Sequence, residues 1–236
     1  MTKNLDIPAF LDRRPIVWSY SLLHCFDDIC PYQGEARYIT RSIKFVETEE
    51  IKWGNRVHEA FEMRVGGNKP LPLEMQSWER FAAPYDGRGA RVEQWFGITA
   101  DGHACDSRAA NVWGRGKVDL HIVNGEAAFV NDWKTGNSKY EDPFELEVSA
   151  LLINARYPQL KKIIGQYTWL KDERTSQTYD LSNTAATWKR VCDIMTKILA
   201  WRAAGDYPKN RTPLCGWCQR FDCENNSNPS KPNGQA

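Results

Sequence analysis

The spacing of hydrophobic residues changes several times along the chain, and each change predicts a different kind of element. A spacing of three to four residues predicts helices over 19–30, 49–65, 142–158 and 183–205, with a shorter one around 74–81. Alternating or continuous apolar positions predict strands over 91–99, 114–123, 127–134, 161–170 and 176–181. Helices that flank strands in this order predict an α/β fold with a central mixed β-sheet flanked by helices.

A tight turn is expected at residues 124–126, where Asn-Gly-Glu separates two of the predicted strands. Pairing around this turn sets residues whose numbers add to about 249–251 opposite each other, which brings Asp119 close to Asp132. The two-residue period of a strand puts Asp132 and Lys134 on one face and Trp133 on the other. An Asp/Lys pair at a strand end is, on its own, more often a weak surface ion pair.

Two neighbouring carboxylates repel each other, and a bound divalent cation allows both to stay ionised. Hard oxygen ligands favour Mg²⁺ or Mn²⁺. A lysine beside them lowers the pKa of a metal-bound water or stabilises negative charge on a phosphate that is being transferred. Asp119, Asp132 and Lys134 are therefore candidate catalytic residues.

Composition adds limits to this picture. The chain has 236 residues and a formal net charge of +1, so a nucleic-acid partner must be held by a local basic groove. No apolar run reaches the roughly 20 residues that cross a bilayer, and the N-terminal residues lack the apolar region of a signal peptide. We expect a cytoplasmic location and no membrane partner. We also expect an N-terminal arm over 1–18, a single domain over 19–223 and a disordered tail over 224–236.

The seven cysteines are unlike a disulfide framework, because no secretion signal accompanies them and the cytosol is reducing. Cys215, Cys218 and Cys223 form a C-x2-C-x4-C group, which is one ligand short of a tetrahedral metal site. All-thiolate ligation suits either zinc or a 4Fe-4S cluster. A fourth ligand must therefore come from elsewhere in the chain.

The residues around the predicted hairpin resemble a known family. The segment 116–119 (GKVD) matches a G-x-(I/V)-D strand, and Asp132, Lys134 and the Thr-Gly turn at 135–136 match a D-x-K strand. This order is similar to the nuclease core of the PD-(D/E)XK superfamily, specifically its RecB-like branch. The resemblance implies a restriction-endonuclease-like core and DNA as the partner.

Further positions follow or depart from that family pattern. His58, preceded by Gly54, matches the family's metal-binding histidine on a helix, and Glu93 falls where the family often has a glutamate. Glu145 stands where the family has glutamine, and Ser149 where it has tyrosine. Glu93, Glu145 and Ser149 are thus candidate DNA-positioning residues, and the two departures concern the hold on the substrate more than metal binding.

The resemblance also assigns roles. His58, Asp119, Asp132 and the backbone carbonyl of Trp133 would hold Mg²⁺ or Mn²⁺, and Lys134 would position the attacking water. The implied reaction is hydrolysis of phosphodiester bonds.

The resemblance extends to the cysteines. The segment 19–31 is similar to an N-terminal motif of RecB-type iron-sulfur exonucleases, including CRISPR-associated ones, that supplies one cluster ligand. It implies a 4Fe-4S cluster on Cys30, Cys215, Cys218 and Cys223, with zinc as the alternative metal. Cys25 is a competing fourth ligand. A cluster on these residues would join the N- and C-terminal segments as a structural staple.

The leading prediction is a Mg- or Mn-dependent DNA exonuclease that acts at DNA ends, with single-stranded DNA at the catalytic centre. Trp53, Trp95, Trp113 and Trp169 are available for base stacking, although tryptophans at such spacings are more often core. Two alternatives remain: a catalytically decayed DNA-binding or scaffold subunit of a recombination or CRISPR adaptation complex, and a zinc-stapled DNA-binding module. An oligomer is compatible with each, and phage recombination, repair and CRISPR adaptation are all compatible pathways.

Overall fold

The computed structural model describes residues 15–44 and 46–230. Contacts divide the chain into two compact units: residues 47–188, called here the sheet unit, and residues 1–46 with 189–236, called here the cysteine unit. The single domain predicted over 19–223 stays a prediction. No helix in the described part of the chain is both long and apolar enough to cross a membrane.

The sheet unit is built on a seven-stranded sheet with the order β2-β1-β3-β4-β5-β6, in which β7 also pairs with β5. Only β4 and β5 run parallel, and the other pairs are antiparallel. The predicted central mixed sheet is therefore confirmed. The strands are β1 (Arg91–Ile98), β2 (Ala104–Cys105), β3 (Gly114–Asn124), β4 (Ala127–Lys134), β5 (Lys162–Trp169), β6 (Arg174–Thr175) and β7 (Tyr179–Asp180).

The hairpin between β3 and β4 has the predicted register. Leu120 pairs with Asn131, and the ladder continues to Asn124 opposite Ala127. Gly125 in the turn has a φ of 57°, a left-handed conformation that glycine adopts at little cost. Within the strand predicted over 176–181, by contrast, only β7 forms, and β6 lies just before this range. Between them the Ser176 hydroxyl takes the place of a backbone acceptor and receives a hydrogen bond from the Tyr167 N–H at 2.9 Å.

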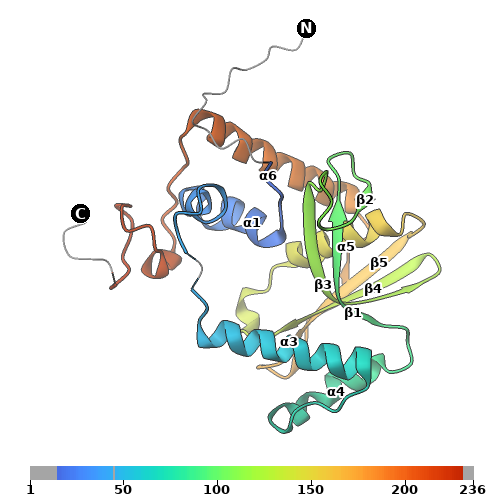
Figure 1. The fold of residues 1–236 in the computed structure, drawn as a ribbon. Helices are drawn as coiled ribbons and strands as arrows, with labels where there is room; N and C mark the ends of the chain where they lie inside the picture. The colour runs from blue at the N-terminus through green and yellow to red at the C-terminus, as the bar shows by residue number, and fades with distance from the viewer. Residues whose placement is uncertain (1–14, 45, 231–236) are drawn as a thin grey trace. The chain divides into compact units, whose positions relative to one another are not determined.

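Helices pack against this sheet (Figure 1). The long helix α3 (Glu49–Gly67) begins at the N-cap Thr48, whose hydroxyl accepts from the Ile51 N–H. A 3₁₀ turn (Leu73–Trp78), the short helix α4 (Glu79–Ala82) and a second 3₁₀ turn (Ala83–Tyr85) follow it. Helix α5 (Pro143–Arg156) begins after the N-cap Asp142 and connects β4 to β5. These elements confirm the helices predicted over 49–65 and 142–158.

Neighbouring residues of β4 face different helices. Trp133 is fully buried, and its ring centroid lies 4.7 Å from that of Phe61 in α3. Lys134 points the other way and contacts Glu145 in α5. Asp132 lies 2.9 Å from Lys134, so the predicted alternation along this strand is confirmed. Asp132 is thus carried on a strand that contacts α3 through Trp133 on one face and α5 through Lys134 on the other.

The cysteine unit contains short helical pieces and part of a long helix. These are α1 (Tyr20–His24), a π turn (Cys25–Ile29), α2 (Pro31–Gly34), a second π turn (Glu35–Ile39), α6 (Thr184–Ala204, from Lys189 onward in this unit) and a 3₁₀ turn (Pro213–Trp217). Pro31 ends the first predicted helix, as expected, but also begins α2, where its missing N–H is an unpaired position anyway.

Aromatic side chains form the core of the cysteine unit. Phe26 stacks on Trp201 with 6.4 Å between ring centroids, and Tyr207 lies 6.3 Å away. A Cβ on Gly34 would come within 2.8 Å of the Phe26 ring, so α2 approaches this ring only because residue 34 is glycine. Trp18, at the end of the predicted N-terminal arm, is fully buried, while residues 1–14 lie outside the described residues.

The predicted disordered tail begins inside the described structure. Asn226 donates a hydrogen bond to the Cys218 carbonyl at 2.8 Å, and Asn228 donates to the same carbonyl at 3.1 Å. Residues 224–230 therefore belong to the loop that carries the cysteines, because their amide side chains satisfy its backbone. Residues 231–236 lie outside the described residues.

Candidate functional site

Asp119 lies on β3 at the point where the regular ladder with β4 stops. Its side chain is largely buried, and its Oδ2 accepts a hydrogen bond from the Trp133 N–H at 3.0 Å. The last regular pair is Leu120 with Asn131, so the next part of β4 satisfies its backbone with a carboxylate instead of a strand carbonyl. The backbone of β4 thereby fixes the orientation of Asp119.

Helix α3 brings His58 to this carboxylate. The His58 Nδ1 lies 3.1 Å from Glu93 Oε1 and 3.4 Å from Asp119 Oδ1. These three residues each offer a ligand atom, and the three atoms lie within 4.8 Å of one another. Burial lowers the pKa of His58, but hydrogen bonds to Asp119 and Glu93 outweigh it and raise the pKa to about 10. A protonated imidazole therefore balances the two carboxylates.

Glu93 reaches His58 through an irregularity in β1. Its φ is 51°, in the left-handed region that a glutamate rarely adopts, and the neighbouring ladder pairs lie at Val92 and Gln94. The side chain is only 4% exposed and also forms an ion pair with Lys117. Burial raises the pKa of Glu93, but the hydrogen bonds to His58 and Lys117 more than offset this and lower it. Such a backbone is typical of a functional position.

Asp132 supplies a further carboxylate on β4. Its Oδ2 lies at ion-pair distance, 2.9 Å, from Lys134 Nζ, yet this buried oxygen accepts no hydrogen bond of acceptable geometry. Burial, followed by the charge of Asp119, raises the pKa of Asp132 to about 6. A buried carboxylate oxygen without a hydrogen bond suits a cation, because a metal ligand bond satisfies the same lone pair.

Lys134 links Asp132 to helix α5. Its Nζ donates to Glu145 Oε2 at 2.6 Å, and both side chains are about one-quarter exposed. Burial lowers the pKa of Lys134, but the charges of Asp132 and Glu145 outweigh it, so the pKa rises and the ammonium persists. Burial and the charge of Asp132 raise the pKa of Glu145 to about 7. Glu145 therefore pairs with Lys134 across β4 and α5.

The roles predicted for Glu93, Glu145 and Ser149 stay predictions, but their contacts are now defined. The structure places Glu93 among the possible metal ligands and Glu145 beside Lys134. The Ser149 hydroxyl donates to the Glu145 carbonyl at 3.1 Å, one turn earlier in α5, and so serves the helix backbone. Lys117 was missed in the sequence, although its position two residues before Asp119 puts it on the same strand face.

The four predicted cluster ligands line one small cavity in the cysteine unit. Cys30, Cys215, Cys218 and Cys223 all contribute to its wall. Cys25, the competing ligand, is buried and does not line this cavity, although its thiol lies close enough to Cys30 and Cys218 for their charges to act on it; burial raises the pKa of this thiol to about 11. Of the two N-terminal thiols, the structure places Cys30 with the C-terminal group.

Backbone N–H groups point at two of these sulfurs. The Thr212 N–H donates to Cys215 Sγ at 3.4 Å, and the Arg220 N–H donates to Cys218 Sγ at 3.4 Å. Burial raises the pKa of the Cys218 thiol, and the hydrogen bond from the Arg220 N–H offsets part of this rise. Over residues 15–44 and 46–230, no three cysteine sulfurs lie within 4.8 Å of one another. Tetrahedral zinc would hold them about 3.8 Å apart, as its 2.3 Å bonds require.

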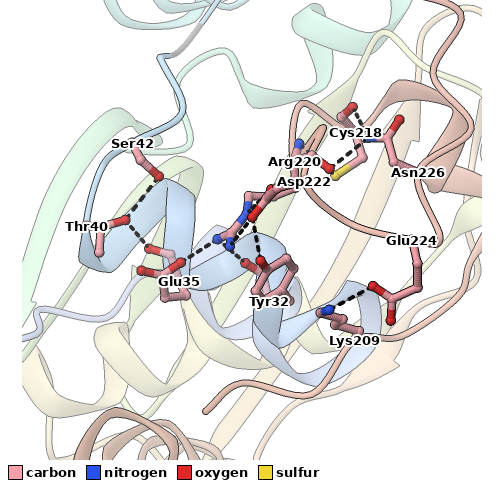
Figure 2. Close-up of polar contacts among 10 residues, drawn as sticks. All are labelled: Tyr32, Glu35, Thr40, Ser42, Lys209, Cys218, Arg220, Asp222, Glu224 and Asn226. Carbon is pink, nitrogen blue, oxygen red and sulfur yellow. Dashed lines mark hydrogen bonds and ion pairs between the residues drawn. The ribbon is translucent and has the colours of Figure 1, made fainter. Parts of the chain in front are cut away.

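A polar network around Arg220 holds the cysteine loop to α2 (Figure 2). The guanidinium lies 3.5 Å from the Tyr32 ring centroid and donates to the Tyr32 carbonyl at 3.1 Å. It also forms ion pairs with Glu35 and Asp222, and the Tyr32 hydroxyl donates to the same Asp222. These partners surround the guanidinium, so Arg220 stabilises the contact between the cysteine loop and α2.

No protein-family model matches the chain, and no curated protein matches it at a significant level. Solved structures do. A protein from Eubacterium rectale named "putative exonuclease" has 12% identity and a TM-score of 0.53, with 86% of this chain and 87% of that chain covered. The protein SSO0001 has 14% identity and a TM-score of 0.45, with 79% and 78% covered. At this identity the first likeness shows a shared fold.

Proposed function

We propose that this protein is a metal-dependent DNA exonuclease of the PD-(D/E)XK kind that hydrolyses phosphodiester bonds from DNA ends and accepts single-stranded DNA. The observation that carries the proposal is the convergence of His58, Glu93 and Asp119, whose ligand atoms lie within 4.8 Å of one another. The proposal that the protein is a nuclease rests also on the fold shared with the Eubacterium rectale protein named "putative exonuclease".

The donor set fits a divalent cation. His58, Glu93, Asp119 and Asp132 offer carboxylate oxygens and one imidazole, a combination that suits Mg²⁺ and, because of the imidazole, Mn²⁺. The Asp132 oxygen without a hydrogen bond and the carbonyl of Trp133 are further ligands in this proposal. A bound cation supplies a Lewis acid for the phosphoryl oxygen and lowers the pKa of the attacking water.

Other residues of the site orient the carboxylates and stabilise the reacting groups. The Trp133 N–H and Lys117 hold the carboxylates of Asp119 and Glu93 in place. Lys134 donates a hydrogen bond to the attacking water and to the phosphate as negative charge grows on it. Glu145 keeps this lysine charged and oriented between β4 and α5.

The cysteine cavity supports a second part of the proposal, a 4Fe-4S cluster on Cys30, Cys215, Cys218 and Cys223. Each cysteine of such a cluster binds a different iron, so their sulfurs lie farther apart than around one zinc ion. The place of all four cysteines around one cavity and the N–H donors to Cys215 and Cys218 support metal ligation here. Its role is to join the 15–44 segment to the C-terminal loop.

The nuclease proposal is tested with single strands labelled at the 5′ or the 3′ end, incubated with Mn²⁺. Wild type is expected to release labelled mononucleotides or short fragments from one end, and Asp132→Ala to release none. Glu126→Ala is the matched control, because Glu126 is an exposed carboxylate paired with Lys161 on the surface. Equal activity in wild type and Asp132→Ala contradicts the proposal. No activity in either favours the DNA-binding or scaffold subunit of a recombination or CRISPR adaptation complex.

The cluster proposal is tested on protein purified without oxygen. We expect a brown sample that contains iron and acid-labile sulfide in equal amounts, and the loss of both in Cys30→Ala. A colourless sample that contains zinc and no iron contradicts the cluster and supports the zinc-stapled module.

A further inference from the structure

An exposed tryptophan stands beside the carboxylate group on the same face of the sheet. Trp95 of β1 is 58% exposed, whereas its neighbours Phe96 and Ile98 are buried. In the β1–β3 ladder Trp95 lies directly opposite Lys117, which is itself 42% exposed. A single exposed apolar side chain is common on protein surfaces, so it is the position of Trp95 beside the carboxylates and opposite a lysine that singles it out.

Contacts connect this tryptophan to the candidate metal ligands. Lys117, opposite Trp95, forms an ion pair with Glu93, and Glu93 contacts His58. The left-handed backbone at Glu93 interrupts the regular alternation of β1, so it is their shared neighbour Lys117 that places Glu93 beside Trp95. Arg115 is exposed and two residues from Lys117, so it extends the same face away from the carboxylates.

The other tryptophans proposed for base stacking are occupied. Trp169 is 5% exposed. The Trp113 ring lies 5.2 Å from that of Trp188, and the Trp53 ring lies 6.2 Å from that of Trp78 and beneath the Arg56 guanidinium. Among the four, Trp95 is the one with an open ring face.

We propose that Trp95, Lys117 and Arg115 form a binding platform for single-stranded DNA, which leads the strand into the carboxylate site. Trp95 stacks on a base, and the two cations lie along the phosphate backbone. The choice of DNA as the polymer rests on the proposed function. The platform itself rests on the exposed indole and the cations around it.

Charge explains why a platform is needed there. The site gathers the carboxylates of Glu93, Asp119 and Asp132, which repel a phosphodiester chain. Arg115 and Lys117 provide positive charge on the approach, and stacking adds affinity that does not depend on the base. A polymer that is shortened from its end must be held at every sequence, and an aromatic ring with flanking cations meets that requirement.

Binding is measured by fluorescence anisotropy with a labelled oligo(dT) in EDTA, so that no hydrolysis occurs. Trp95→Ala is expected to weaken binding roughly tenfold, the size of one base-aromatic stack. Trp95→Phe should retain most of the affinity, and Trp95→Leu should lose as much as the alanine variant. Leu73→Ala is the control, because Leu73 is also an exposed large hydrophobic residue of the sheet unit (89% exposed) but lies in a 3₁₀ turn outside the sheet.

Salt dependence separates the two kinds of contact. Arg115→Ala should lower the slope of log affinity against log salt by about 0.7, as expected for one lost phosphate contact on a single strand. Trp95→Ala should leave that slope unchanged. Phosphate contacts and stacking thus have different signatures in one titration.

Several results overturn the platform: no binding of oligo(dT) by wild type, equal affinity of wild type and Trp95→Ala, or equal losses in Trp95→Phe and Trp95→Leu. A change of oligomeric state in Trp95→Ala with unchanged DNA affinity would assign this face to a second copy of the chain. The proposed function fails separately. If the binding pattern holds but no Mn²⁺-dependent cleavage occurs, the platform stands and the nuclease does not.

Discussion

The sheet unit and the cysteine unit each gather reactive side chains, but they hold them by different means. In the sheet unit the carboxylates lie on strands and next to a helix whose apolar faces are buried, as Trp133 and Phe61 illustrate. In the cysteine unit the thiols lie on a loop and a 3₁₀ turn, which polar contacts around Arg220 connect to α2.

Because of this difference, we expect substitutions in the two units to affect different properties, activity in the sheet unit and folding in the cysteine unit. Hydrophobic burial maintains the sheet whether or not its charged groups are intact, so changes at the carboxylate site should affect activity first. The cysteine loop buries few apolar side chains, so its order depends on ion pairs and, in our proposal, on a metal cluster. Changes there should affect folding first.

The largest effect is expected at Lys134. The variant Lys134→Met with Glu145→Gln removes the ammonium and neutralises Glu145, so that of the two carboxylates paired with Lys134 only Asp132 loses its partner. We expect a fall in kcat of about 10²- to 10³-fold, the effect of losing one donor to a transition-state charge. Glu145→Gln alone is the matched control and should stay within about tenfold of wild type, since an amide still accepts from Lys134. Equal losses in the two variants would make Glu145, and not Lys134, the essential group.

In the cysteine unit the largest effect is expected at Arg220. Arg220→Met leaves Glu35 uncompensated in a mostly buried site and should lower the free energy of unfolding by about 3 kcal/mol. Urea unfolding followed by circular dichroism measures it. Lys209→Met is the control, because its ion pair with Glu224 is exposed and should contribute under about 1 kcal/mol. Similar losses in both variants would show that the network around Arg220 contributes no more to the free energy of unfolding than an exposed ion pair does.

A smaller effect concerns pH. Without metal, the pKa of His58 is about 10, so this residue is protonated at pH 7 and stabilises the fold fully below about 6.5. A histidine binds metal only as the neutral imidazole, so binding of Mn²⁺ to His58 at pH 7 should release a proton. Its affinity should rise by up to about tenfold per pH unit toward pH 10. Calorimetry in buffers of different ionisation enthalpy measures the release. His58→Asn should abolish it, and an unchanged release would exclude His58 as a ligand.

The smallest effect is expected at Cys25. Because this thiol is buried and does not line the cysteine cavity, Cys25→Ala should cost about 1 kcal/mol of stability and leave the iron content unchanged. Iron analysis of Cys25→Ala beside Cys30→Ala gives the comparison. Loss of iron in Cys25→Ala but not in Cys30→Ala would make Cys25, and not Cys30, the fourth cluster ligand.

Much of the sheet unit was predictable because its signals are local. The period of apolar residues located its main strands and helices, and the Asn124-Gly125 turn set the register that brings β3 to β4. The same register put Asp119 near the end of β4, as its bond to the Trp133 N–H shows. These features depend on residues that are close in the chain.

Other features depend on contacts that sequence spacing does not encode. The left-handed backbone at Glu93, which turns this side chain to His58, has no signal in the sequence, since glutamate does not favour that conformation. The pair of Lys134 with Glu145 depends on how α5 crosses the sheet. Cys25 begins a π turn, and Cys30, which follows this turn, adopts an extended conformation (φ −164°). A helical wheel of 3.6 residues per turn does not anticipate that geometry.

The central claim is that the residues around Asp119 form a metal-dependent catalytic centre. It is tested most directly by the rate of hydrolysis of end-labelled single-stranded DNA as a function of Mn²⁺ concentration, in wild type and Asp119→Asn. We predict a rate that rises with Mn²⁺ to a plateau in wild type and stays at background in the variant. A wild type that is inactive at every Mn²⁺ concentration, or a variant with the same curve, would contradict the claim.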